Sequence, residues 1–114
     1  MKTLEKNECP INNILQILTG PWTTHILWLL KCNGTMRFGE LKNQIEGISS
    51  KVLTQRLKFL AGENIIFRKI ESPKPLKVIY GLTQKGHELS SVCKSLNELA
   101  LTWKNVTVLE ENNG

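Results

Sequence analysis

The sequence is short of cysteine, of aromatic residues and of long apolar runs, and each shortage excludes a class of protein. Its three cysteines (Cys9, Cys32 and Cys93) are an odd number without Cys-x-x-Cys spacing, which argues against a disulfide framework and a zinc site. Aromatic residues make up 6% of the chain, which does not favour a platform that stacks single-stranded bases. The longest apolar run, residues 26–30, falls far below the roughly 20 residues of a membrane span. Because the N-terminal stretch also lacks the apolar segment of a signal peptide, we expect a cytoplasmic protein that does not engage a membrane.

The residue combinations that mark an enzyme are also missing. His25 and His87 are far apart in the sequence, and neither has a paired carboxylate or a ligand spacing. The sequence shows no nucleophile and base pair, no phosphate-binding glycine loop and no set of metal ligands. We therefore expect no catalytic activity, no metal and no cofactor.

What the chain does have is a basic middle. Its 114 residues fit one domain (1–114) with a small core, and a domain of this size often gains stability by pairing with a second copy. The net charge is +5, but residues 31–85 hold eleven Lys and Arg against four Glu, a local net charge of +7. A field of this sign suits a polyanion such as DNA, although a merely solvated basic surface gives the same count.

The order of apolar periods and breaking residues predicts a mainly helical α+β fold. A helix-turn-helix over residues 38–62, followed directly by a two-stranded wing over residues 65–82, is the winged-helix arrangement. Residues 35–38 are either a short strand or an extended connection. The remaining expected elements are a helix over 10–19, a helix that begins at Pro21 and stops at Asn33-Gly34, a hairpin tip at residues 72–75, and a helix over 83–107 capped by Thr83.

The helix that begins near Ser49 is the expected recognition helix. Its inner side is apolar, while no acidic residue interrupts its outer side, which suits contacts in the major groove. The candidate DNA contacts on it are Ser49, Ser50, Lys51, Thr54, Gln55 and Lys58, with Lys58 assigned to phosphate. Arg56 lies nearer the apolar edge, where either a partner within the chain or a phosphate fits. Any amphipathic helix has a polar outer face, so the prediction depends on three features: the glycine turn before the helix, the absence of acids on its outer face, and the hairpin after it.

The expected wing is basic and its tip is stiffened by proline. Arg68, Lys74 and Lys77 are candidate DNA contacts, and prolines at positions 73 and 75 fix the direction of the tip. Rigid basic tips lie along a DNA backbone or enter the minor groove, whereas many hairpin tips are simply solvated.

The last helix has a narrow apolar seam that predicts a homodimer. The spacing is 3, 4, 3, 4, 3, typical of one helix packing along another, and the seam consists of Leu89, Val92, Leu96, Leu99, Trp103 and Val106. A helix of about 24 residues is about 36 Å long, which exceeds the body of such a small domain. We expect the first helix, with Ile14, to join the interface, although packing on the chain's own core gives a similar pattern.

Several motifs resemble the HxlR-type transcriptional regulators over roughly residues 9–99. They are Cys9-Pro10-Ile11, Gly20-Pro21-Trp22-Thr23, Arg37-Phe38-Gly39-Glu40-Leu41, Gly47-Ile48-Ser49, Val52-Leu53-Thr54-Gln55-Arg56-Leu57 and Val78-Ile79-Tyr80-Gly81-Leu82-Thr83. The resemblance implies a dimeric winged-helix protein of bacterial or archaeal type that binds double-stranded DNA, and hence association with the nucleoid. If the resemblance is set aside, the alternative to a DNA-binding regulator is a winged-helix module that binds another protein.

The resemblance also makes Cys9 a candidate redox sensor. Some HxlR-type proteins sense electrophiles or oxidants through the cysteine of the Cys-Pro motif, which corresponds to Cys9. A thiol just before a helix lies near the positive end of the helix dipole, which favours the thiolate. This chain departs from the family in having Pro21 where a lysine is usual, so any support that this lysine gives to a thiolate is missing. The alternative is that Cys9 is a partly buried cysteine without a functional role. Separately, we expect a small-molecule effector as a further partner of the protein.

Overall fold

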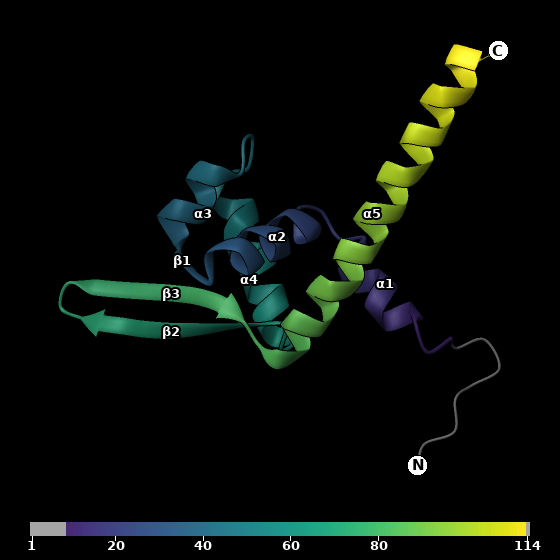
Figure 1. The fold of residues 1–114 in the computed structure, drawn as a ribbon. Helices are drawn as coiled ribbons and strands as arrows, with labels where there is room; N and C mark the ends of the chain where they lie inside the picture. The colour runs from purple at the N-terminus through teal and green to yellow at the C-terminus, as the bar shows by residue number, and fades with distance from the viewer. Residues whose placement is uncertain (1–8, 114) are drawn as a thin grey trace.

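The computed structural model describes residues 9–113, with side chains up to residue 105, and it shows five helices and three strands in that part of the chain. A helical body carries a hairpin that projects to one side and a long helix that projects to the other (Figure 1). The elements are α1 (Asn12–Leu18), α2 (Thr23–Asn33), β1 (Thr35–Arg37), α3 (Phe38–Gln44), α4 (Ser50–Gly62), β2 (Ile66–Pro73), β3 (Leu76–Leu82) and α5 (Gln84–Asn113).

The core lies between α2, α3, α4 and the base of the hairpin. α2 contributes three of its most deeply buried side chains, Ile26, Leu27 and Leu30, each at most 1% exposed. The inner side of α4 meets them through Leu53, Leu57 and Leu60, at the i, i+4, i+7 spacing of one helical face. α4 is therefore fixed from behind, which leaves its other side free.

The ambiguous segment after α2 is a strand. β1 pairs antiparallel with β3, so the sheet has three strands in the order β1-β3-β2. Met36 of β1 is 4% exposed and joins the core, which explains why so short a strand is held in place. β2 and β3 pair along nearly their whole length, with an irregularity between Ile70 and Ser72.

Several boundaries differ from the expected ones. α1 begins at Asn12 rather than Pro10, and α2 begins at Thr23 rather than Pro21, because Trp22 has a left-handed backbone with φ of 65°. The hairpin tip is tighter than expected, since Pro73 pairs with Leu76 and only Lys74 and Pro75 turn the chain.

The cap of the last helix is confirmed. The hydroxyl of Thr83 accepts a hydrogen bond from the Gly86 N–H at 3.0 Å and donates to the Asn64 carbonyl at 2.7 Å. This residue therefore ties the start of α5 to the end of the helix-turn-helix segment. α5 continues to Asn113, beyond the expected end near 107, and Val106 lies outside the residues whose side chains the structure describes.

The molecule is extended for its length. Its radius of gyration is 17.5 Å and its dimensions are 63 × 43 × 23 Å, whereas a compact chain of this length has a radius of about 13 Å. The projecting hairpin and α5 account for the difference (Figure 1). None of the helices between residues 9 and 113 combines the length and hydropathy that crossing a bilayer requires.

Candidate nucleic-acid interface

The turn between α3 and α4 sets the direction of the candidate recognition helix. Gly47 has a φ of 87°, a conformation that side-chain-bearing residues rarely adopt. A Cβ at this position would lie 3.8 Å from the ring of Trp22, so the turn also rests against the residue that precedes α2. Ser49 then caps α4, as expected, because its Oγ accepts a hydrogen bond from the Val52 N–H at 3.1 Å.

The outer face of α4 is exposed and free of acidic residues. Its candidate DNA contacts are all exposed, and apart from the cap made by Ser49 their side chains make no hydrogen bond or ion pair with other described residues; they are Ser49, Ser50, Lys51, Thr54, Gln55 and Lys58. The geometry thus brings the expected set onto one accessible face. Lysine, glutamine and hydroxyl donors on such a face can reach base edges and phosphates in a major groove.

Arg56 has a hydrogen-bond partner within the chain. Of the two partners that its position on the helix allowed, a group within the chain or a phosphate, the structure shows the first. Its Nη2 donates to the Oγ1 of Thr23 at 2.6 Å, and its guanidinium lies 4.6 Å from the centre of the Phe59 ring. Burial lowers the pKa of Arg56, and its Nε is buried without a hydrogen-bond partner among the described residues. The residue therefore connects α4 to the start of α2.

Gly20 allows this connection to form. A Cβ at Gly20 would overlap the Nη2 of Arg56, so only glycine lets the guanidinium reach Thr23 without a shift. Thr23 is fully buried, and its hydroxyl is the acceptor. Sequence reasoning missed the roles of Gly20 and Thr23; the only signal was the position of Arg56 at the apolar edge of α4.

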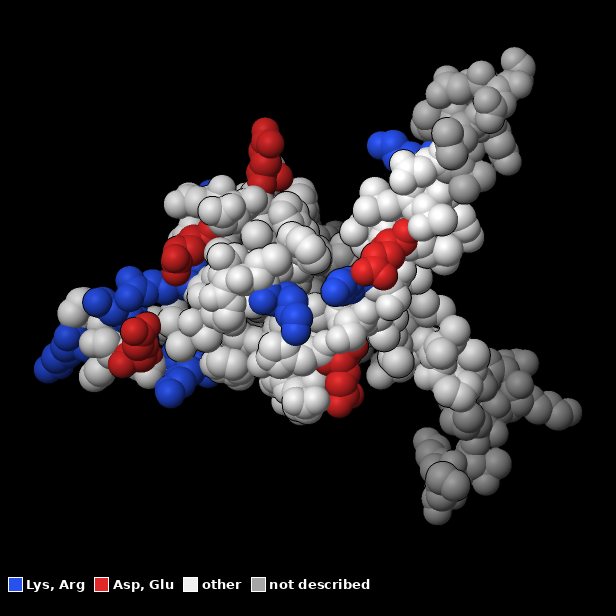
Figure 2. All heavy atoms as spheres, in the orientation of Figure 1, with Lys and Arg blue, Asp and Glu red and all other residues white. Residues whose placement is uncertain are grey.

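The hairpin presents positive charge beside the helix-turn-helix. Arg68 and Lys74 are exposed and Lys77 is half-buried, and Figure 2 shows Lys and Arg side chains gathered along the projecting hairpin. The single acid of the hairpin, Glu71, faces Arg37 at 3.9 Å. This pair is half exposed, so it is weak. It nevertheless places the negative charge against a cation of β1 and leaves the other basic side chains of the hairpin without a described ion pair.

A second surface, on α1 and α5, is apolar and exposed. Val92, Leu96 and Leu99 of α5 are 45%, 52% and 44% exposed, and Trp103 is 65% exposed. Ile14 of α1 is 41% exposed and lies with Val92 along a groove between the two helices. Leu89 differs from the rest of the expected seam, because it is 7% exposed and packs in the core of its own chain.

The comparisons with known proteins agree with this geometry. Residues 17–108 match the family model described as HxlR-like helix-turn-helix. The chain belongs to the HxlR family. The regulatory protein MalR of Fusobacterium mortiferum is 40% identical over 93 residues, which cover 82% of this chain and 88% of MalR.

Two transcription regulators of solved structure share the fold. The reduced form of YodB from Bacillus subtilis superposes with a TM-score of 0.74 at 35% identity, covering 82% of this chain and 91% of YodB; YodB has also been solved after diamide treatment. The redox regulator HypR in its reduced form superposes with a TM-score of 0.77 at 27% identity, covering 90% of this chain and 99% of HypR.

These findings confirm the family and the winged-helix fold expected from the sequence. The chain is a helix-turn-helix transcriptional regulator with homologues in bacteria, and its relatives are regulators rather than enzymes. In the winged-helix fold of this HxlR-family chain, α3 and α4 are two helices joined by a turn, and β2 and β3 are the hairpin that follows them.

The three cysteines lie in different environments. Cys9 precedes α1 and is exposed, and Cys32 is exposed on α2. Cys93 is half-buried on α5 and packs against the core. Burial raises the pKa of the Cys93 thiol, although a backbone hydrogen bond acts in the opposite direction. This environment favours the neutral thiol and agrees with a packing role for Cys93.

Proposed function

We propose that this HxlR-family regulator binds an inverted-repeat operator in double-stranded DNA as a homodimer, with sequence specificity supplied by α4. The observation that carries the proposal is the exposed, acid-free outer face of α4 next to a basic wing. A helix of this kind fits the major groove, and a projecting hairpin can contact the neighbouring backbone or minor groove.

The proposed contacts divide into two classes. Lys51, Thr54 and Gln55 are assigned to base edges, because lysine donates to guanine acceptors, glutamine pairs with adenine, and hydroxyls serve either. Ser50 lies at the margin of this set, close to the N-terminal N–H groups of α4 that suit a phosphate. The contacts assigned to the backbone are Ser49, Lys58, Arg68, Lys74 and Lys77.

The homodimer is supported by the apolar surface on α1 and α5. Exposed side chains at i, i+4 and i+7 on α5 form one stripe, and a long stripe of this kind is unfavourable in water. The proposed interface consists of Ile14, Val92, Leu96, Leu99 and Trp103, without Leu89. Two-fold symmetry then places the two α4 helices in successive major grooves of an inverted repeat.

A footprint tests the proposal. The purified chain is incubated with DNA from upstream of its own gene and of the neighbouring genes, and protected positions are mapped at several salt concentrations. We expect protection of two half-sites about one helical turn apart and an affinity that falls steeply with salt. Affinity that stays in the nonspecific range on every fragment would contradict the proposal and favour a protein-binding module.

Regulation of DNA binding by oxidation of the Cys9 thiol is a separate part of the proposal. It is supported by the exposure of Cys9 next to α1 and by relatives that include a regulator solved after diamide treatment and a redox regulator. Diamide takes two electrons and two protons from two thiols, which then share a disulfide. A disulfide from Cys9 to Cys9 or Cys93 of the other subunit would move α1 and change the separation of the two α4 helices.

A paired variant tests this thiol input. Diamide is expected to alter operator binding of the natural chain and to yield a covalent dimer on a non-reducing gel. Cys9→Ser should bind DNA as before and lose both responses, whereas Cys32→Ser, the matched exposed cysteine, should keep them. A natural chain whose DNA binding ignores diamide would remove Cys9 as a sensor.

A further inference from the structure

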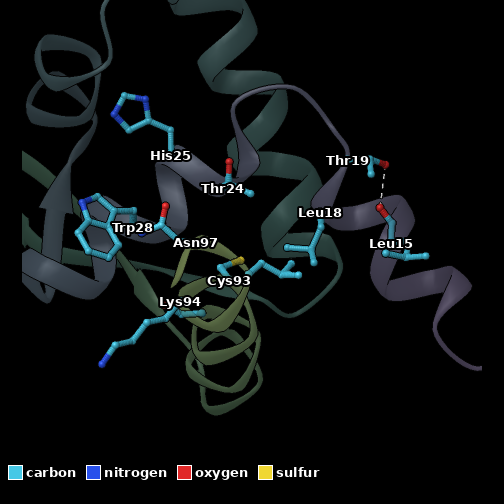
Figure 3. Close-up of a pocket in the computed structure, with 11 residues that line it drawn as sticks. Leu15, Leu18, Thr19, Thr24, His25, Trp28, Cys93, Lys94 and Asn97 are labelled. Atoms are coloured by element: carbon cyan, nitrogen blue, oxygen red, sulfur yellow. Dashed lines mark hydrogen bonds between the residues drawn. The ribbon is translucent and has the colours of Figure 1, made fainter. Parts of the chain in front are cut away.

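A cleft between α1, α2 and α5 has the size and lining of a small-molecule site. Its volume is about 630 Å³, within the range of about 300–1,000 Å³ usual for ligand cavities. Leu15 and Leu18 of α1, Trp28 of α2 and Leu96 of α5 supply most of its apolar lining. Figure 3 shows the Trp28 ring, the Asn97 amide and the Cys93 thiol next to one another.

The polar groups in this cleft have unused hydrogen-bonding capacity. The side chains of Thr24, Ser90 and Asn97 line it, and none of them is hydrogen-bonded to another described residue. Ser90 as a whole residue is 6% exposed. An apolar cavity with a few convergent polar groups is the usual form of a ligand site.

The charges of the residues that line the cleft favour a negatively charged ligand over a positively charged one. No acidic residue lines the cleft, and Lys94 is its only side chain with a permanent charge. In Figure 3 the Lys94 side chain points outward, away from Cys93, so its ammonium reaches the mouth of the cleft only when this exposed side chain turns. A cation that turns toward the mouth of the cleft attracts an anion, and Asn97 can donate to its oxygen atoms.

On α5 the cleft lies apart from the surface assigned to the second subunit, whereas on α1 Ile14 of that surface is one turn from Leu18 of the cleft. At 100° per residue, Ser90, Cys93, Lys94 and Asn97 are centred about 140° around α5 from the stripe of Val92, Leu96, Leu99 and Trp103. Only Leu96 borders both. A dimer formed along the stripe therefore leaves the α5 side of this cleft uncovered.

The cleft is also connected to α4. Thr24 lines the cleft, and the next residue along the backbone, Thr23, accepts the hydrogen bond from Arg56 of α4. A displacement of Thr24 by a ligand would therefore move the adjacent Thr23, and the hydrogen bond between Thr23 and Arg56 would pass this movement to α4.

We propose that this cleft binds a planar aromatic molecule that carries an acidic oxygen, and that its occupancy changes the position of α4. The aromatic body lies against Trp28 and the leucines, Asn97 donates to the oxygen atoms, and Lys94 turns its ammonium toward the negative charge. The ligand site rests on the geometry of the cleft alone, while its effect on DNA rests on the proposed function.

The binding test uses 2-naphthoate and its uncharged counterpart 2-naphthalenemethanol, titrated by calorimetry into the full chain without DNA. We expect naphthoate to bind at least tenfold more tightly than the alcohol. Trp28→Ala should weaken naphthoate at least tenfold, and Lys94→Met should remove most of its advantage over the alcohol. Leu101→Ala, the control, removes an exposed apolar side chain of α5 that does not line the cleft, and it should bind as the natural chain does.

Two results would overturn the ligand site. One is equal binding of naphthoate by Trp28→Ala and Leu101→Ala, which would mean adsorption to exposed apolar surface. The other is dissociation of a dimer by naphthoate in sedimentation, which would mean that a second subunit occupies the cleft.

A DNA arm separates this inference from the proposed function. Saturating naphthoate is expected to change operator affinity at least fivefold, and Thr23→Val should reduce that effect without weakening naphthoate binding. Trp28-dependent binding with unchanged operator affinity would overturn the coupling to α4. A chain that binds naphthoate and no operator would contradict the proposed function and keep the ligand site.

Discussion

Lys51 and Gln55 lie one turn apart on the exposed face of α4, and they are the residues to which base recognition is assigned. Lys51→Ala or Gln55→Ala should weaken operator binding by about 1–3 kcal/mol and relax the preference for one base pair. Competition between the operator and single-base variants measures this change. Lys58→Ala is the comparison, because a phosphate contact should weaken all sequences alike. Unchanged affinity and unchanged preference in the two variants would remove both residues from the interface.

Arg56 also lies on α4, but the structure gives it a structural role. Its hydrogen bond to the buried hydroxyl of Thr23 joins α4 to α2. Thr23→Val keeps the shape of the side chain and removes the acceptor, so we expect the free energy of unfolding to fall by about 1–2 kcal/mol. Denaturant unfolding of Thr23→Val, Arg56→Met and the double variant measures the coupling.

The control for this pair is Thr24→Val, a substitution of the exposed neighbouring threonine, which should change stability little. If the two single effects simply add in the double variant, the hydrogen bond contributes nothing to the native state.

Cys93 differs from the other cysteines in its reactivity as well as its burial. Because burial raises its pKa, less of this thiol is ionised at a given pH than for an unperturbed cysteine, and the thiolate is the reactive form. At pH 8 iodoacetamide should therefore modify exposed Cys9 and Cys32 well before Cys93. Mass spectrometry of a time course gives the order, and early modification of Cys93 would show that the cleft around it opens readily.

Among the elements, the wing is proposed to contribute affinity without specificity. Lys74 is one of the two residues of the hairpin turn, beyond the last paired residues Pro73 and Leu76, and its side chain is exposed. Lys74→Ala should lower affinity for all DNA sequences and reduce the slope of log K against log salt by about one, since one phosphate contact is lost. Binding isotherms between low and moderate salt on specific and unrelated DNA test this, and an effect confined to the operator would place Lys74 on a base instead.

The helices and strands were predictable where one local rule decides them. The inner leucines of α4, the Ser49 cap and the Thr83 cap follow from periodicity and capping chemistry, and the structure has all of them. The start of α2 was displaced by two residues, because the left-handed backbone of Trp22 depends on packing that no local pattern shows.

The residues of the candidate interface were likewise predictable from the sequence only in part. The exposed face of α4 follows from helical periodicity within one segment, so the sequence was enough to place its residues together. The contact of Gly20 and Thr23 with Arg56 joins residues more than 30 positions apart, and only the folded chain brings them together. Leu89 fits the 3-4 spacing of the seam yet belongs to the core, because spacing along α5 does not tell which partner a side chain meets.

At the scale of the whole molecule, α5 would set the position of α4 relative to a second α4 in the proposed dimer. The apolar stripe of α5 is exposed in the single chain, and the molecule is extended along its projecting elements. Burial of such a stripe against a second copy stabilises the pair by removing apolar surface from water. Half-site spacing in an operator would then be a property of the dimer rather than of α4 alone.

Charge placed in the stripe should separate the two subunits without unfolding either one. Leu99 is 44% exposed and lies outside the core cluster, so Leu99→Lys leaves the packing of the single chain intact. Sedimentation should show a monomer at concentrations where the natural chain is a dimer, because an unpaired lysine would be buried in the interface. Operator affinity should fall at least a hundredfold, while affinity for one half-site changes little. Leu101→Lys, also on α5 and 52% exposed but outside the stripe, is the matched control and should remain dimeric. A Leu99→Lys chain that stays dimeric and protects both half-sites would place the subunit interface on another surface.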